Sequence, residues 1–195
     1  MVYSKIRSYA KLSSFLNIAR RYFILNGFDG LYTMLGIVVG SYVAGQHDPG
    51  IVLGTGLAGI VALGGSGFAT AFLSESAERK RELKKIEKSM LISLKGTMHD
   101  EARKFASVST ALVNGFSPII ASTVMVFPFL LSYFGMISVQ SAFSSSIAIA
   151  VAEIFLLGCY LGVISGESRT SYGVKMLLIA VATAGLSFII AGVFK

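Results

Sequence analysis

The chain has 195 residues, of which 54% are hydrophobic and only 14% are charged, and its mean hydropathy is +0.72. A soluble domain carries about 25% charged residues, and one soluble core of this size cannot bury so much apolar surface, which excludes an ordinary soluble fold. The net charge of +7 could suit nucleic acid, but the basic residues are confined to segments between apolar runs, so we expect no nucleic-acid partner.

The amino-terminal segment, residues 1–21, carries five basic residues, no acid and a partly apolar helical stripe. This pattern predicts an interfacial helix lying on the cytoplasmic leaflet. A first apolar span follows at 22–45, and a polar turn at 46–50 separates it from a second span at 51–74.

The segment at 75–105 is strongly charged and predicts a cytosolic helical segment. Three further spans are expected at 106–134, 141–164 and 173–194, each long enough for the roughly 20 residues that cross a bilayer. The spans are continuous apolar runs without period-two alternation, which favours helices over a β-barrel. The sequence therefore predicts an all-α integral membrane protein with five transmembrane helices.

Orientation follows from the distribution of Lys and Arg. With five spans, 16 of the 17 basic residues fall on one side, and Lys195 falls on the other. Cytoplasmic loops carry an excess of basic residues, so this side is expected to be cytoplasmic, together with the amino terminus.

Two acidic residues fall inside predicted spans. Asp29 lies about two turns into the first span, and Glu153 lies near the middle of the fourth. Ionisable residues at such depths are costly and typical of transport pathways. The alternatives are that Asp29 caps a helix beginning at Gly30, and that Glu153 is a neutral acid hydrogen-bonded to a neighbouring helix.

Further acidic residues flank the spans in the charged segment. Glu75, Glu78 and Glu82 recur at helical spacing on one face, and Glu101 ends a Met-His-Asp-Glu cluster. Oxygen ligands with an occasional His or Met suit divalent first-row cations, so all four are candidate metal ligands. The interleaved Lys and Arg allow the simpler interpretation of a solvated helix with Glu–Lys pairs.

Small residues recur in the first span at Gly36, Gly40 and Ala44, and they crowd the second span. Such residues let membrane helices approach closely, either within one chain or at a dimer seam. No P-loop or HExxH motif occurs, so neither a nucleotide-driven pump nor a zinc-dependent hydrolase of that type is expected. We expect no enzymatic activity and no bound cofactor.

The sequence resembles the vacuolar iron transporter family over nearly its whole length. The most specific match is Gly27-Phe28-Asp29-Gly30-Leu31-x-Thr33, which opens the first span. Weaker matches are the end of the second span, Ser74-Glu75-Ser76-Ala77-Glu78-Arg79, then Phe127-Pro128-Phe129 in the third span and Ala184-Gly185-Leu186-Ser187-Phe188 in the fifth. The order of five spans also matches.

This resemblance implies a dimer that exchanges cytosolic Fe²⁺, and often Mn²⁺, for protons. Asp29 matches the first-span aspartate of the family, and Glu75, Glu78 and Glu82 match its cytosolic glutamates loosely. Two departures concern the metal: the cytosolic segment is shorter and more basic than in the family, and Leu63 stands where the family often has methionine.

The expected function is therefore a proton-coupled divalent metal transporter that exports metal from the cytoplasm. Its expected partners are the metal ions, membrane lipid and a second copy of the chain. The expected location is the cell membrane of a prokaryote or a vacuole-type membrane of a eukaryote. Two alternatives stay open: a carrier of another substrate on the same scaffold, because fold does not fix function, or a non-transporting adaptor whose basic segment docks a partner or anionic lipid.

Overall fold

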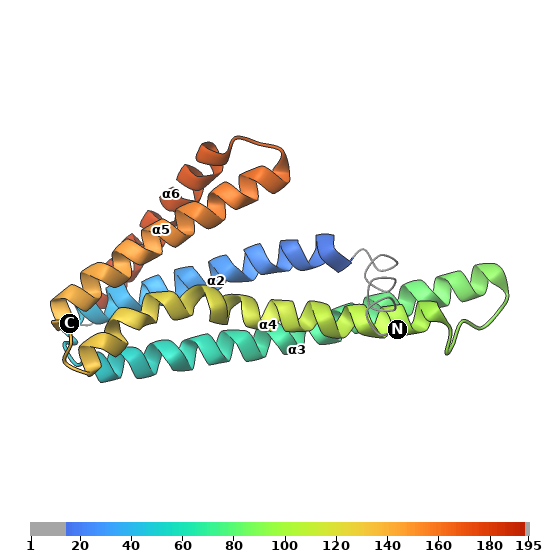
Figure 1. Ribbon diagram of the computed structural model, residues 1–195, viewed down its shortest axis with the longest axis horizontal. Helices are drawn as coiled ribbons and strands as arrows, with labels where there is room; N and C mark the ends of the chain where they lie inside the picture. The colour runs from blue at the N-terminus through green and yellow to red at the C-terminus, as the bar shows by residue number, and fades with distance from the viewer. Residues whose placement is uncertain (1–14, 194–195) are drawn as a thin grey trace.

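The computed structural model describes residues 15–193, which form five helices (Figure 1). These are α2 (Phe15–Val43), α3 (Pro49–Met90), α4 (Met98–Tyr133), α5 (Val139–Ser165) and α6 (Arg169–Val193). Each is long and apolar enough to cross a membrane, and no strand occurs within residues 15–193. The expected all-α fold with five spans is thus confirmed.

The first helix starts earlier than the first apolar span. Residues 15–21, which we expected in an interfacial helix, form the first turns of α2, and residues 1–14 lie outside the described residues. No Pro or Gly interrupts the chain between Phe15 and Tyr22, so nothing in the local sequence ends one helix and begins another there.

The short connections are built by local capping. The carboxylate of Asp48 accepts the Gly50 N–H at 2.8 Å, and Pro49 occupies the first helical position of α3. Ser138 caps α5 by accepting the Ser141 N–H at 3.1 Å. At the other end of α5, Gly166 adopts a left-handed φ of 71°, which lets the chain reverse directly into α6.

The charged segment at 75–105 forms the far end of a long helical hairpin. α3 has 42 residues, about 63 Å at 1.5 Å per residue, so it extends well beyond a hydrocarbon core of about 30 Å. Its end, the turn at 91–97 and the first turns of α4 project from the bundle (Figure 1). Glu87 fixes the turn by accepting the Leu94 N–H at 2.8 Å, and Asp100 pairs with Arg103 at 2.8 Å.

Glycines allow close approach inside the bundle. A Cβ on Gly64 of α3 would lie 2.8 Å from the Gly115 carbonyl oxygen of α4, and a Cβ on Gly30 of α2 would lie 2.8 Å from Pro118 Cα of α4. A Cβ on Gly158 of α5 would lie 2.9 Å from Gly173 Cα of α6. The helices therefore form a packed group of α2, α3 and α4, and a pair of α5 and α6 that diverges from it toward one end (Figure 1).

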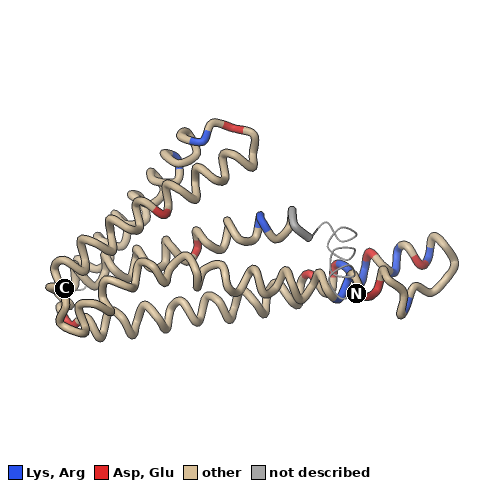
Figure 2. The backbone as a smooth tube through the Cα atoms, in the orientation of Figure 1, with Lys and Arg blue, Asp and Glu red and all other residues tan. Residues whose placement is uncertain are grey.

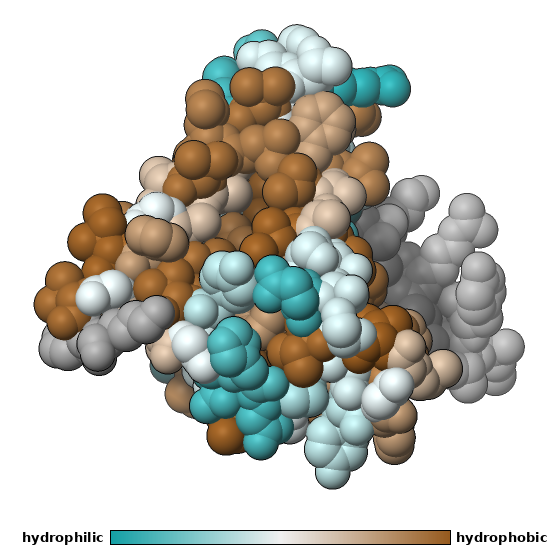
Figure 3. All heavy atoms as spheres, turned by 90° about the vertical axis from the view of Figure 1, so that its left-hand side faces the viewer, coloured by the Kyte–Doolittle hydropathy of each residue, from teal (hydrophilic) through white to brown (hydrophobic). Residues whose placement is uncertain are grey.

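Charge separates the two ends of the molecule. Every described Lys and Arg lies toward the end that holds the α3–α4 and α5–α6 turns, which we call the basic end (Figure 2). The opposite end holds the turns at 44–48 and 134–138. Figure 3 looks at this opposite end and shows a hydrophilic patch with apolar side chains around and behind it. Exposed apolar residues such as Val61, Leu156 and Val181, each 65% exposed or more, cover the sides, as expected for a surface in contact with lipid.

Candidate functional site

Asp29 lies near the middle of the first span. It lies 14 residues after Phe15, the first residue of α2, which is about 21 Å along the helix axis. Because α2 begins at Phe15, Asp29 is inside the helix, which removes the alternative that it caps a helix starting at Gly30.

The side of α2 that carries Asp29 is uncovered. Leu25, Asp29 and Thr33 are spaced by one turn each, and all three are exposed. No hydrogen bond or ion pair joins Asp29 to another residue in the described part of the chain. An ionised carboxylate facing hydrocarbon is costly, so this face needs a protein partner, water or a cation beside it.

Glu153 occupies the middle of α5. The residue is half-buried, and its Oε2 atom is fully buried without a hydrogen-bond partner among residues 15–193. Ser146 lies two turns earlier on the same side of α5, and its hydroxyl donates to the Met125 carbonyl of α4 at 2.7 Å. At Ser146 this side of α5 contacts α4, and the buried Oε2 atom shows that the carboxyl group of Glu153 is oriented into the protein.

The chemistry of these two acids is set by what surrounds them. The described membrane-spanning stretches contain no Lys or Arg near mid-depth that could neutralise either carboxylate. A buried carboxylate without a cationic partner must be protonated, hydrated or bound to a cation. Protons and metal ions compete for the same carboxylate oxygen atoms, so acids in this setting are candidates for exchanging one for the other.

The glutamates of α3 differ in their exposure and in their contacts with other side chains. The Tyr22 hydroxyl donates to Glu75 Oε1 at 3.2 Å, and Arg79 pairs with Glu75 Oε2 at 2.8 Å. Glu78 and Glu82 of α3 are exposed, and so is Glu101 at the start of α4. Glu75 thus connects α2 to α3, and a metal at that residue would have to displace Arg79.

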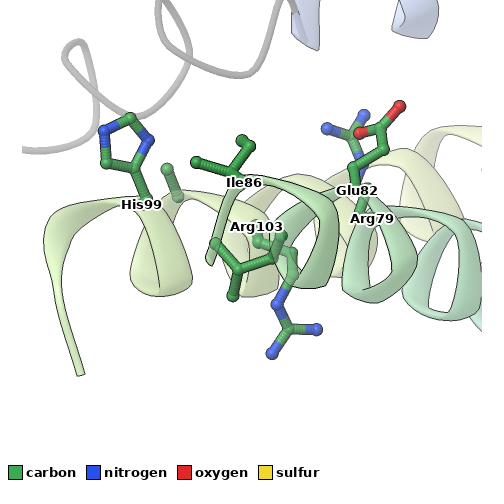
Figure 4. A pocket seen from close by; sticks show the side chains of 7 residues that line it. Arg79, Glu82, Ile86, His99 and Arg103 are labelled. Atoms are coloured by element: carbon green, nitrogen blue, oxygen red, sulfur yellow. The ribbon is translucent and has the colours of Figure 1, made fainter. Parts of the chain in front are cut away.

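Glu82 also lines a small cavity on the α3–α4 hairpin, of about 130 Å³. His99 and Arg103 line the same cavity, with Ile86 between His99 and Glu82 (Figure 4). Two arginines at this cavity disfavour a cation. In the chain between residues 15 and 193, no three His, Cys, Asp or Glu side chains are close enough to hold one metal ion. The metal-ligand roles of Glu75, Glu78, Glu82 and Glu101 stay predictions.

A buried amide contact was missed by the sequence analysis. Asn26 of α2 donates to the side-chain oxygen of Asn114 in α4, and Asn114 donates to the Gly67 carbonyl of α3 at 2.6 Å. The contact joins three helices one turn from Asp29. A signal was available, because the tripeptide Asn-Gly-Phe occurs at 26–28 and again at 114–116, in two helices that run in the same direction.

Comparison with known proteins identifies the family to which this chain belongs. Residues 20–92, which include Asp29 and the glutamates of α3, match the VIT family. Over 177 residues the chain is 33% identical to an uncharacterized protein of Methanocaldococcus jannaschii, and the alignment covers 89% of each chain. The family points to transport of a divalent metal rather than to enzymatic catalysis. With five apolar helices and these matches, the chain is a multi-pass integral membrane protein that belongs to the VIT family.

Proposed function

We propose that the protein exchanges a divalent metal, Fe²⁺ or Mn²⁺, for protons, and exports the metal from the cytoplasm. The observation that carries the proposal is the pair of intramembrane acids, Asp29 and Glu153, on a transporter scaffold without a nearby Lys or Arg. Metal favours the charged carboxylates and protonation disfavours metal, so proton and metal gradients become linked at the same groups.

The two acids take different roles in this proposal. Asp29 is the central metal ligand, because its face is open and Thr33 offers a further oxygen one turn away. Glu153 is the proton carrier, because its buried Oε2 atom lacks a partner that would hold the charged form. Glu78, Glu82 and Glu101 attract metal to the entrance, while Glu75 is committed to Tyr22 and Arg79.

In this proposal, a second copy of the chain packs against the side of α2 that carries Asp29. A Cβ on Gly40 would meet nothing within 4 Å, whereas one on Gly36 would lie 3.3 Å from Ser187 Oγ of α6. The exposed residues Asp29 and Thr33, continued by Gly40, thus leave a strip of α2 open for its symmetry mate. A homodimer formed there would bring two Asp29 carboxylates to one metal path.

The proposed orientation places the basic end in the cytoplasm, following the positive-inside rule. In a prokaryote the protein would then reside in the cell membrane. Single cysteines at positions 48 and 88, in a Cys159→Ser background, should be labelled from opposite sides. Labelling of both positions from the same side would contradict the five-span orientation.

The deciding experiment is metal uptake into liposomes, with and without an imposed pH gradient, and with metal binding measured in parallel. Asp29→Asn should abolish flux, and Glu153→Gln should blunt the response to the gradient more than it weakens binding. Glu167→Gln, which changes an exposed acid outside the spans, is the matched control and should behave as wild type.

The same assay separates the alternatives. Wild-type dependence on the pH gradient in Glu153→Gln would make that acid a structural group and refute the coupling scheme. Competition among metals would reveal another substrate. Absence of any metal-dependent proton flux in the wild type would favour the adaptor.

A further inference from the structure

A cleft separates α2 from α5 at the basic end. The α5–α6 pair diverges from α2 in this direction (Figure 1), and the space between them has a volume of about 430 Å³. We call it the wedge cleft. Its lining includes Arg20, Arg21, Ile24 and Leu25 of α2, and Leu161 and Ile164 of α5.

The wedge cleft is basic at one end and apolar along the rest of its length, which matches the headgroup and the acyl chains of a lipid. Leu25 and Ile164 remain 51% and 39% exposed within it, so its walls offer apolar surface. Arg20 and Arg21 are exposed at the point where the apolar span of α2 begins. About 7 Å of helix separates Arg20 from Leu25, so the positive charge lies directly above the apolar wall.

We propose that the wedge cleft binds one anionic glycerophospholipid, with its phosphate at Arg20 and Arg21 and an acyl chain along Leu25, Leu161 and Ile164. The lining contains no acidic residue that would repel a phosphate. Arginine favours phosphate through paired, charge-assisted hydrogen bonds, and basic pockets between membrane helices are suited to acidic lipid headgroups.

The chemistry favours a lipid over a soluble anion. A free phosphate would use the two arginines but would leave the apolar walls uncovered beside the bilayer. An acyl chain covers these walls, and each buried CH₂ contributes about 0.8 kcal/mol of transfer free energy. Because the cleft lies between α2 and the helix that carries Glu153, a bound lipid would also favour the diverged arrangement of α5 and α6.

The chain contains no tryptophan, which allows a direct test with a single introduced indole. Ile164→Trp places the reporter in the wedge cleft, and Leu25→Trp is a second reporter if the first variant folds poorly. Leu156→Trp is the control, because Leu156 lies on α5, is 65% exposed and does not line the cleft. Quenching is compared in vesicles that contain brominated phosphatidylglycerol or brominated phosphatidylcholine.

We expect the anionic lipid to be preferred at position 164 by roughly fivefold to thirtyfold, since each basic residue near the headgroups contributes about a fivefold gain. Position 156 should show little preference. The double change Arg20→Gln and Arg21→Gln should remove the preference, whereas Lys84→Gln with Lys88→Gln, which alters charge equally at the same end, should leave it.

Equal quenching by both lipids at position 164 would overturn the proposal, as would a preference that survives loss of both arginines. Weak quenching by both lipids would show that a protein segment, such as residues 1–14, fills the cleft instead. Loss of the preference on adding millimolar glycerol phosphate would show a site for free oxyanions. None of these outcomes depends on whether the protein transports metal.

Discussion

The contact between Gly30 and α4 sets how closely α2 can approach the helix behind it. A Cβ at position 30 would lie 2.5 Å from Ser122 Oγ and 2.8 Å from both Cα and O of Pro118. The Ser122 side chain can rotate, but the backbone of Pro118 cannot. Carbon atoms attract at about 3.5 Å, so Gly30→Ala should push α2 away from α4 by about 0.7 Å.

The expected cost is about 1–3 kcal/mol from overpacking, reduced by up to about 1 kcal/mol because Ala favours helix over Gly. Gly185→Ala is the matched control. Gly185 is also inside a helix, but a Cβ there would meet nothing within 4 Å, so this variant should be neutral or slightly more stable.

Reversible unfolding in mixed micelles, followed by circular dichroism, measures both free energies. In the liposome assay, Gly30→Ala should also have a lower metal flux than Gly185→Ala. Asp29 precedes Gly30 directly and would move with the displaced helix. If Gly30→Ala unfolds like Gly185→Ala and keeps wild-type flux, α2 does not pack on Pro118 as described, and the placement of Asp29 is wrong.

Three more predictions concern the polar contacts, the dimer and the glutamates of α3. Asn114→Leu should lower the free energy of unfolding by about 1–2 kcal/mol, because it removes both the contact with Asn26 of α2 and the hydrogen bond to the Gly67 carbonyl of α3; an unchanged unfolding curve would argue against these contacts. Gly40→Leu should weaken dimerisation, measured by crosslinking in lipid, and an intact dimer with full transport would contradict the α2 seam. The triple change of Glu75, Glu78 and Glu82 to Gln should lower metal affinity but retain turnover at high metal, so complete loss of turnover in a folded protein would place these residues in the obligatory path.

The five helices were predictable because each rests on information local in sequence. A continuous apolar run of sufficient length dictates a helix in lipid, and the connections carry their own signals. Asp48 before Pro49 specifies the start of α3, and Gly166 specifies the end of α5. These features need no knowledge of distant residues.

Contacts between distant residues could not be predicted in the same way. Glu75 was grouped with Glu78 and Glu82 by helical spacing, but Tyr22, 53 residues away, distinguishes it by donating to its carboxylate. The pairing of Asn26 with Asn114 spans 88 residues and depends on α2 and α4 lying side by side in the same direction. The wedge cleft likewise depends on the angle between α2 and α5, which no periodicity encodes.

The placement of the two acids on different groups of helices bears on coupling. Asp29 lies on α2, which is held to α3 and α4 by the Asn26 and Tyr22 hydrogen bonds. Glu153 lies on α5, which packs with α6 and diverges from α2 at the basic end (Figure 1). A movement of the α5–α6 pair would therefore change the surroundings of Glu153 directly. The α2 helix would stay attached to α3 and α4 by the amide and tyrosine contacts and would lose or shift its contact with α6, where Tyr32 donates to the Met176 carbonyl at 3.2 Å. A stationary metal ligand and a mobile proton carrier would allow one arrangement to favour metal and the other to favour protons, which is the differential affinity that coupled exchange requires.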